Sequence, residues 1–269
     1  MDLSCRANPF ITDHRKPLSI PKMPRSSRTH PILIALLLLG LSACGPDPQS
    51  AQPGEAPAEA TLSPQQLTDL ARVKQDAGAY DEAIAYLQKA LSADPQFAPA
   101  HYRMGTVYEQ WDKREEAIAA YRKAVELAPD SAENHLALGL IYGKAVKNEL
   151  AVKEYLQAAR LNPGDAGIHF NIALEYWYLQ DIPHAEEHYR KTLELDPKHI
   201  QARLNLAGVY EHTKEWEKEL KEIAIAQQMG RESGNEQAVR IAGEKLAFLK
   251  GRIHMTEEEF KRKTQPPFE

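Results

Sequence analysis

The chain has 269 residues and a formal net charge of −5, and 43% of its residues are apolar but only 7% are aromatic. Residues 1–43 carry six basic and two acidic side chains, which leaves 27 basic and 36 acidic residues in the remainder. A nucleic-acid-binding protein needs a basic face, so this acidic body argues against nucleic acid as a partner.

The chain begins with the features of a secretory signal peptide. A basic flank at residues 22–30 precedes an apolar run, Ile32–Leu41, and small residues follow that run. This order of basic, apolar and small residues is typical of a cleaved leader. The run of about 10 apolar residues is too short to cross a bilayer, which takes about 20. We therefore predict a leader over residues 1–43, with Met23 as an alternative start.

The sequence Leu41-Ser42-Ala43-Cys44 resembles the lipobox of bacterial lipoproteins, in which the cysteine is lipidated and becomes the first residue of the mature chain. The resemblance implies lipidation of Cys44 and a place in the bacterial cell envelope, with the body in the periplasm. It also favours the outer membrane, because Gly45 stands where some lipoproteins carry an aspartate that retains them at the inner membrane. The alternative is an uncleaved anchor with an incidental cysteine.

Residues 44–62 are predicted to form a flexible linker. They are rich in Pro, Ala, Gln and Glu and show no apolar periodicity, so they cannot bury enough surface to order themselves. A flexible chain of this length spans on the order of 20–25 Å, which would hold the body off the membrane. Cys5 and Cys44 are the two cysteines of the sequence. A mature chain lipidated at Cys44 would therefore form no disulfide.

From Ser63 onward the chain repeats with a period of 34 residues, which is marked by prolines at 95, 129, 163 and 197. A fixed period of this size indicates stacked supersecondary units rather than one globular core. Position 8 of each unit is small, and positions 7 and 24 are mostly bulky. Small residues let two helices approach, while bulky ones fill the space between them. Taking Pro95 as position 32 gives five units over 64–233, namely 64–97, 98–131, 132–165, 166–199 and 200–233.

This period and pattern resemble the tetratricopeptide repeat family, whose unit is a helix–turn–helix. The resemblance implies an all-α fold, a right-handed superhelix (α-solenoid) of about five repeats. The fifth unit departs from the pattern, with Glu219 in place of alanine and Arg231 in place of proline. Residues 234–250 show helical apolar spacing and are predicted to cap the open end of the solenoid. Residues 251–269 are predicted to be a tail, in which Thr256 and Glu259 form a capping-box pattern that would begin one short helix.

In this family the first helix of each unit lines a concave face, and the register implies which residues would contact a partner there. The segment 168–179 agrees, because it is apolar nearly all round and a solenoid helix that buries its flanks would expose the surplus apolar face. We expect an extended apolar or aromatic protein segment to bind there. A groove closed by the chain's own tail, or shielded by a tight superhelix, is the alternative. The implied contact residues are Tyr102, Leu136, Leu140, Phe170, Asn171, Leu174, Trp177, Tyr178, Leu204 and Asn205.

Two histidine patterns suggest a metal site, and the repeat register argues against both. His184 and His188 match the H-x-x-E-H pattern of some zinc peptidases. They occupy positions that are mostly polar in the other units, so we expect them on the outer convex face without a third ligand. His101, His135 and His169 recur at position 4, where the family has a bulky packing residue, so we expect them to pack within the units. We predict no metal and no cofactor.

Leader, linker, repeats and cap account for the whole chain and leave no room for a catalytic domain. We therefore predict a non-enzymatic scaffold for protein–protein interaction that is tethered to the membrane through its lipid alone. Two alternatives remain open, a pilotin-like lipoprotein of type IV pilus or secretin assembly and a metal-dependent hydrolase that uses His184 and His188. The identity of the partner does not follow, because repeats of one fold carry many ligands.

Overall fold

The computed structural model describes residues 62–266, and this part of the chain contains twelve α-helices and no strand. The predicted leader, Cys44 and nearly all of the predicted linker lie outside the described residues. None of the twelve helices is both long enough and apolar enough to cross a membrane. The helices are α1 Pro64–Asp76, α2 Tyr80–Ala93, α3 Ala98–Gln110, α4 Arg114–Leu127, α5 Ala132–Lys144, α6 Asn148–Leu161, α7 Ala166–Tyr178, α8 Ile182–Leu195, α9 Ile200–Thr213, α10 Trp216–Ser233, α11 Glu236–Arg252 and α12 Glu257–Thr264.

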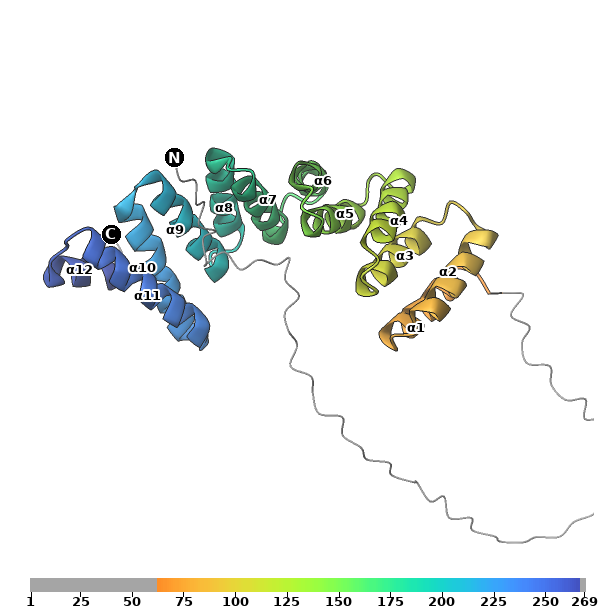
Figure 1. The fold of residues 1–269 in the computed structure, drawn as a ribbon, viewed down its shortest axis with the longest axis horizontal. Helices are drawn as coiled ribbons and strands as arrows, with labels where there is room; N and C mark the ends of the chain where they lie inside the picture. Colours follow the sequence, from red (N-terminus) through yellow and green to blue (C-terminus); the bar gives the residue numbers. More distant parts are fainter. Residues whose placement is uncertain (1–61, 267–269) are drawn as a thin grey trace, which may run out of the picture.

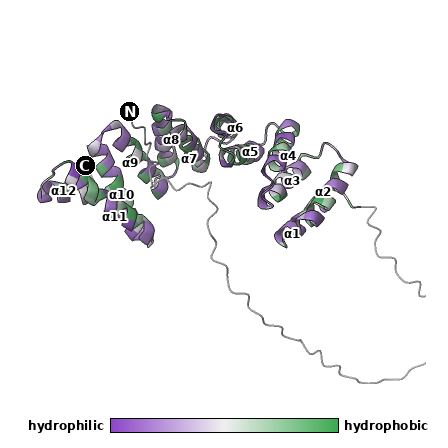
Figure 2. Cartoon of the chain, viewed as in Figure 1, coloured by the Kyte–Doolittle hydropathy of each residue, from purple (hydrophilic) through white to green (hydrophobic). Residues whose placement is uncertain are grey.

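The first ten helices form five hairpins, whose first helices begin 34 residues apart. The two helices of a hairpin pack against each other, and the second helix also packs against the first helix of the next hairpin. The hairpins follow one another along an arch, with α1, α3 and α5 on its inner side (Figure 1). Hydrophilic residues dominate α12, whereas the paired helices carry both kinds (Figure 2). The predicted all-α solenoid of five helical repeats is therefore confirmed.

A residue in the left-handed conformation closes the turn inside each hairpin. Gly78 has this role in the first hairpin, with φ of 75°, and Asp112, Val146, Gln180 and Lys214 occupy the equivalent place with φ between 58° and 63°. The left-handed region favours glycine, because a Cβ atom there crowds the following carbonyl. Val146 fits it worst, since its side chain is β-branched.

Close contact between the helices of a hairpin explains the small residue at position 8. A Cβ atom on Gly105 would lie 2.6 Å from the ring of Tyr121, and one on Gly139 would lie 2.6 Å from the ring of Tyr155. Neither contact leaves room for a side chain. The predicted pairing of small and bulky positions is thereby confirmed in the second and third hairpins.

Side chains at position 4 tie each hairpin to the one before it. His101 and His135 donate a hydrogen bond from Nε2 to the carbonyl oxygen of the proline six residues earlier, at 3.3 and 3.0 Å. Arg203 donates to the equivalent proline carbonyl at 3.1 Å, and His169 makes a hydrogen bond to the backbone of Pro163. The sequence predicts that these histidines pack within their own units, whereas their bonds to proline reach the preceding unit. The proline that ends one hairpin thus also accepts a hydrogen bond from the next.

The fifth hairpin differs from the others where its sequence does. Its second helix, α10, has 18 residues instead of 14, because no proline stops it before Gly234, whose φ is 70°. Glu219, at the alanine position, is buried in the hairpin with 3% exposure. The predicted cap corresponds to α11, which packs against α10. α11 continues to Arg252, two residues beyond the predicted cap, and the capping box of Thr256 and Glu259 begins α12, the short helix predicted in the tail.

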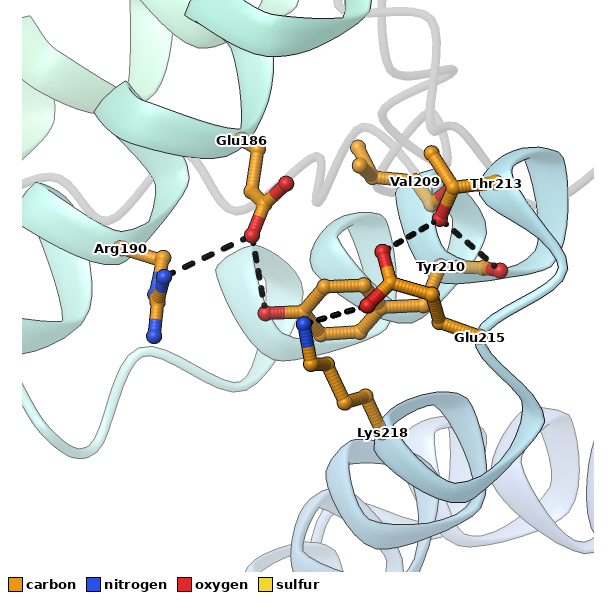
Figure 3. Close-up of polar contacts among 7 residues, drawn as sticks. All are labelled: Glu186, Arg190, Val209, Tyr210, Thr213, Glu215 and Lys218. Carbon is orange, nitrogen blue, oxygen red and sulfur yellow. Dashed lines mark hydrogen bonds and ion pairs between the residues drawn. The ribbon is translucent and has the colours of Figure 1, made fainter.

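A polar cluster joins the fourth hairpin to the fifth (Figure 3). On α8, Glu186 accepts a hydrogen bond from the hydroxyl of Tyr210 at 3.4 Å and pairs with Arg190 at 3.6 Å. On α10, Lys218 lies 5.2 Å from the centre of the Tyr210 ring and pairs with Glu215. Burial and the charge of Glu186 raise the pKa of Tyr210 to about 12. The phenol therefore keeps its proton at neutral pH and donates a hydrogen bond to Glu186.

Candidate functional site

The first helices of the hairpins carry a pocket between α5 and α7. Its volume is about 50 Å³, enough for a few water molecules or the tip of a side chain. Four of the ten predicted contact residues line it, which makes it the centre of the candidate site. The lining residues are Leu140, Gly143, Lys144, Tyr155, Asn171, Leu174, Glu175 and Tyr178.

Six of the predicted contact residues are at least partly accessible. Leu140 is 39% exposed, and it stands at the mouth of the pocket. The half-buried members of the set are Tyr102, Leu136, Asn171, Trp177 and Tyr178. The Trp177 ring lies edge-on to the ring of His212 on α9, with 6.1 Å between the ring centres. The accessible aromatic surface therefore extends from α7 towards the fifth hairpin.

The other four predicted contact residues are buried, so the exposure expected of them is not found. Phe170, Leu174, Leu204 and Asn205 are each 4–6% exposed. The next hairpin covers Phe170, whose ring stacks on that of His199 with 4.7 Å between the centres. Leu204 packs in a core cluster with residues of α10 and α11. Of the four, Leu174 alone also lines the pocket.

Asn205 has a structural partner instead of an open face. Its Nδ2 donates a hydrogen bond to the hydroxyl of Tyr189 at 3.2 Å, and its Oδ1 accepts one from Gln201 at 2.8 Å. Burial raises the pKa of Tyr189, so the hydroxyl stays protonated. Asn205 therefore bonds to both Tyr189 and Gln201 where the fifth hairpin packs against the fourth. Asn171, at the same repeat position in α7, is the asparagine that faces the pocket.

Glu175 is a pocket residue that the sequence reasoning missed. It is 6% exposed, and the equivalent places in the neighbouring hairpins hold the buried aliphatic residues Val107, Ile141 and Val209. Gly143 makes room for it, because a Cβ atom there would lie 2.6 Å from the Glu175 carboxylate oxygen. The repeat pattern could have indicated Glu175, because it places a carboxylate at a position that is aliphatic in the other units.

Lys144 lines the pocket, and charged groups on α3 and α5 connect it to the second hairpin. Glu109 accepts a hydrogen bond from the Tyr121 hydroxyl at 2.9 Å and pairs with Lys144. Tyr102 is hydrogen-bonded to Glu133. Burial and these carboxylates raise the pKa values of both tyrosines, so both phenols remain donors. The two carboxylates are thus occupied by partners within the chain.

The histidines predicted on the convex face differ in exposure. His184 is exposed and its Nδ1 lies 2.8 Å from the Asp181 carboxylate. His188 is half-buried, contrary to expectation, because its ring stacks on that of His169 with 5.3 Å between the centres. Burial, with a smaller effect of His169, lowers the pKa of His188 to about 4. Among residues 62–266, no group of three or more His, Cys, Asp or Glu side chains is placed to hold a metal ion.

Comparison with known proteins identifies the repeats. Models of the tetratricopeptide repeat match residues 75–141 and 170–233. Among solved structures, the chain is similar to MamA, with 25% identity and a TM-score of 0.60 over 62% of this chain and 98% of that one. It is similar to MamA from residue 41 onward of Desulfovibrio magneticus RS-1, with 17% identity and a TM-score of 0.59 over 63% and 96%. It is also similar to YrrB, described as a TPR protein with an unusual peptide-binding site, with 23% identity and a TM-score of 0.58 over 65% and 90%. Among curated proteins, no match was found.

Proposed function

We propose that this chain, which belongs to the tetratricopeptide repeat family, is a non-enzymatic scaffold whose inner face binds an extended segment of a partner protein. The pocket between α5 and α7 carries the proposal. It combines accessible apolar side chains, Leu140 and Tyr178, with the amide of Asn171, which can hydrogen-bond a peptide backbone. Ligand sites typically have this mixture of apolar walls and a few polar groups. The peptide-binding site described for YrrB agrees with such a use of the fold.

The accessible aromatic residues beside the pocket provide the test. Trp and Tyr often contribute most of the binding energy at interfaces, so Trp177→Ala with Tyr178→Ala should reduce partner recovery in a crosslinking pull-down by at least about tenfold. Phe248→Ala is the matched control, because Phe248 is 64% exposed but lies on α11, away from the pocket. Unchanged recovery with the double variant, in a protein that keeps its helical circular dichroism, would remove the inner face as the binding site.

We further propose that the scaffold is held at the outer membrane by a lipid on Cys44, with its body in the periplasm. The lipobox-like sequence before Cys44 supports the tether. Cys44→Ser should move the protein from the membrane fraction to the soluble fraction of its host. Globomycin, which blocks cleavage of lipoprotein leaders, should cause the uncleaved form to accumulate. A Cys44→Ser protein that stays in the membrane fraction would contradict the lipid tether without affecting the binding proposal.

A further inference from the structure

We propose that the segment bound on the inner face carries an acidic side chain, whose carboxylate pairs with Arg103, and an apolar side chain, which enters the pocket between α5 and α7. This inference rests on the proposed function and adds the chemistry of the partner. It is based on the lack of an ion-pair partner for one cation on α3, Arg103.

Arg103 is half-buried, and among residues 62–266 its guanidinium forms no ion pair with a carboxylate, although its charge acts on the phenols of Tyr102 and Tyr121. Its Nε is enclosed and makes no hydrogen bond. Arg203 provides a direct comparison, because its Nε is enclosed and unbonded too. The Nη atoms of Arg203, however, bond to the Glu222 carboxylate at 2.7 Å and to a proline carbonyl at 3.1 Å. No such bond satisfies Arg103. A guanidinium held in this way has donors to spare and has already lost part of its hydration, which favours a charge-assisted bond to an incoming carboxylate.

The carboxylates near Arg103 are engaged elsewhere. Glu109 is bound by the Tyr121 hydroxyl and by Lys144, and Glu133 is hydrogen-bonded to Tyr102. Neither comes within ion-pair distance of Arg103 in the described part of the chain. A carboxylate from a bound segment would therefore not compete with an existing ion pair of Arg103.

The position of Arg103 along the array connects it to the pocket. Arg103 stands in α3 at the repeat position that Asn171 holds in α7, two units later, and Asn171 lines the pocket. Both side chains therefore belong to the same face of the array. The pocket between α5 and α7 begins one unit further along the array than α3. An extended chain advances about 3.3 Å per residue, so we expect several residues between the acidic side chain and the apolar one.

The charge of Arg103 favours an acidic segment over a basic one. Lys144 lies at the pocket itself, on the side facing Arg103's hairpin, and it is 42% exposed. An acidic residue would meet Arg103 along this path, whereas Lys144 is already paired with Glu109 and the carboxylate of Glu175 lines the pocket. A basic residue would leave Arg103 unpaired and face like charge, which is the arrangement that interfaces avoid.

Selection from a displayed library of random twelve-residue peptides, on the full chain, tests the inference. Wild-type protein should enrich sequences that pair Asp or Glu with an apolar residue at one preferred spacing. Arg103→Gln should abolish the acidic preference while keeping the apolar one, and Arg103→Lys should retain part of it. Arg72→Gln is the matched control, because Arg72 lies on the inner helix α1 and is already paired with Asp76. It should leave the selected sequences unchanged.

The outcomes separate the two proposals. Enrichment of apolar residues with no acidic preference, or the same acidic preference in Arg103→Gln, would overturn the role of Arg103 and leave the proposed function intact. Enrichment of Lys or Arg would overturn the role of Arg103 and would indicate that Glu175 recognises a basic residue of the bound segment. Absence of any enrichment would refute both proposals. Enrichment that emerges only after Asp47, Glu55 and Glu59 are changed to glutamine would show that the chain's own residues 44–62 occupy the groove, which overturns the proposal of a partner.

Discussion

Replacing Glu219 by glutamine should stabilise the C-terminal end of the array above pH 7 and remove most of its dependence on pH. Glu219 is 3% exposed, and its Oε2 has no hydrogen-bond partner among residues 62–266. The nearby carboxylate of Glu211 pairs with Lys245 at 3.6 Å and with Arg252 at 3.3 Å. Burial, and then repulsion by Glu211, raise the pKa of Glu219 to about 7, although Lys245 and Arg252 act in the opposite direction.

The size of the effect follows from the difference in proton affinity between the folded and unfolded chain. The ordinary pKa of a glutamate in the unfolded chain is 4.5, and each tenfold difference in proton affinity corresponds to about 1.4 kcal/mol. A folded pKa of about 7 therefore corresponds to about 3 kcal/mol of unfolding free energy. Because the folded pKa is the higher one, this stability is fully present below the unfolded pKa and is lost as the pH rises through about 7. Glutamine has no charge to bury, so the variant should not lose stability in this way as the pH rises.

Urea unfolding of the wild type and of Glu219→Gln, on the acidic and the alkaline side of this range, measures the difference. Hydrogen exchange of α10 and α11 locates it, since a repeat array can open at one end before the other. Glu258→Gln on α12 is the control for net charge, because Glu258 is exposed. If Glu219→Gln kept the pH dependence of the wild type, or proved less stable on the alkaline side, the reasoning from burial would be refuted.

Three further predictions test the packing, the backbone conformation of one turn and a buried hydrogen bond. Gly139→Ala should lower the unfolding free energy by about 1–3 kcal/mol because its Cβ atom would meet the Tyr155 ring. Combining it with Tyr155→Leu in a double-mutant cycle should recover part of that loss. Additive losses of the two substitutions would contradict the contact. Val146→Gly should raise the unfolding free energy by about 1 kcal/mol because it relieves a β-branched residue at φ 59°, and a lower melting temperature would contradict this. Asn205→Ala should cost about 1–3 kcal/mol by leaving the buried Tyr189 hydroxyl without its donor, without changing the affinity for a bound segment. A selective loss of affinity would return Asn205 to the binding site.

The helix positions could be predicted closely from the sequence because packing in a repeat array is local. Each hairpin contacts its neighbours, so a period and a few small and bulky positions are enough to place it. Exposure on the inner face could not be predicted in the same way. Position 5 is half-buried at Tyr102 and Leu136 but buried at Phe170 and Leu204. The difference depends on what packs over each side chain, which is the ring of His199 for Phe170, and α10 of the same hairpin with the cap α11 for Leu204.

Departures from the repeat pattern are informative about function only when their surroundings are known. Glu175 and Glu219 both place a carboxylate at a position that is apolar in other hairpins, and both are buried. Glu175 borders the pocket, where Gly143 makes room for it. Glu219 is buried between helices, and in the described part of the chain its Oε2 accepts no hydrogen bond. The register alone would rank the two as equal candidates for a site. Their surroundings assign the first to the inner face and the second to the stability of the fifth hairpin, and the Glu219→Gln experiment separates these roles because it should change stability and leave peptide selection unchanged.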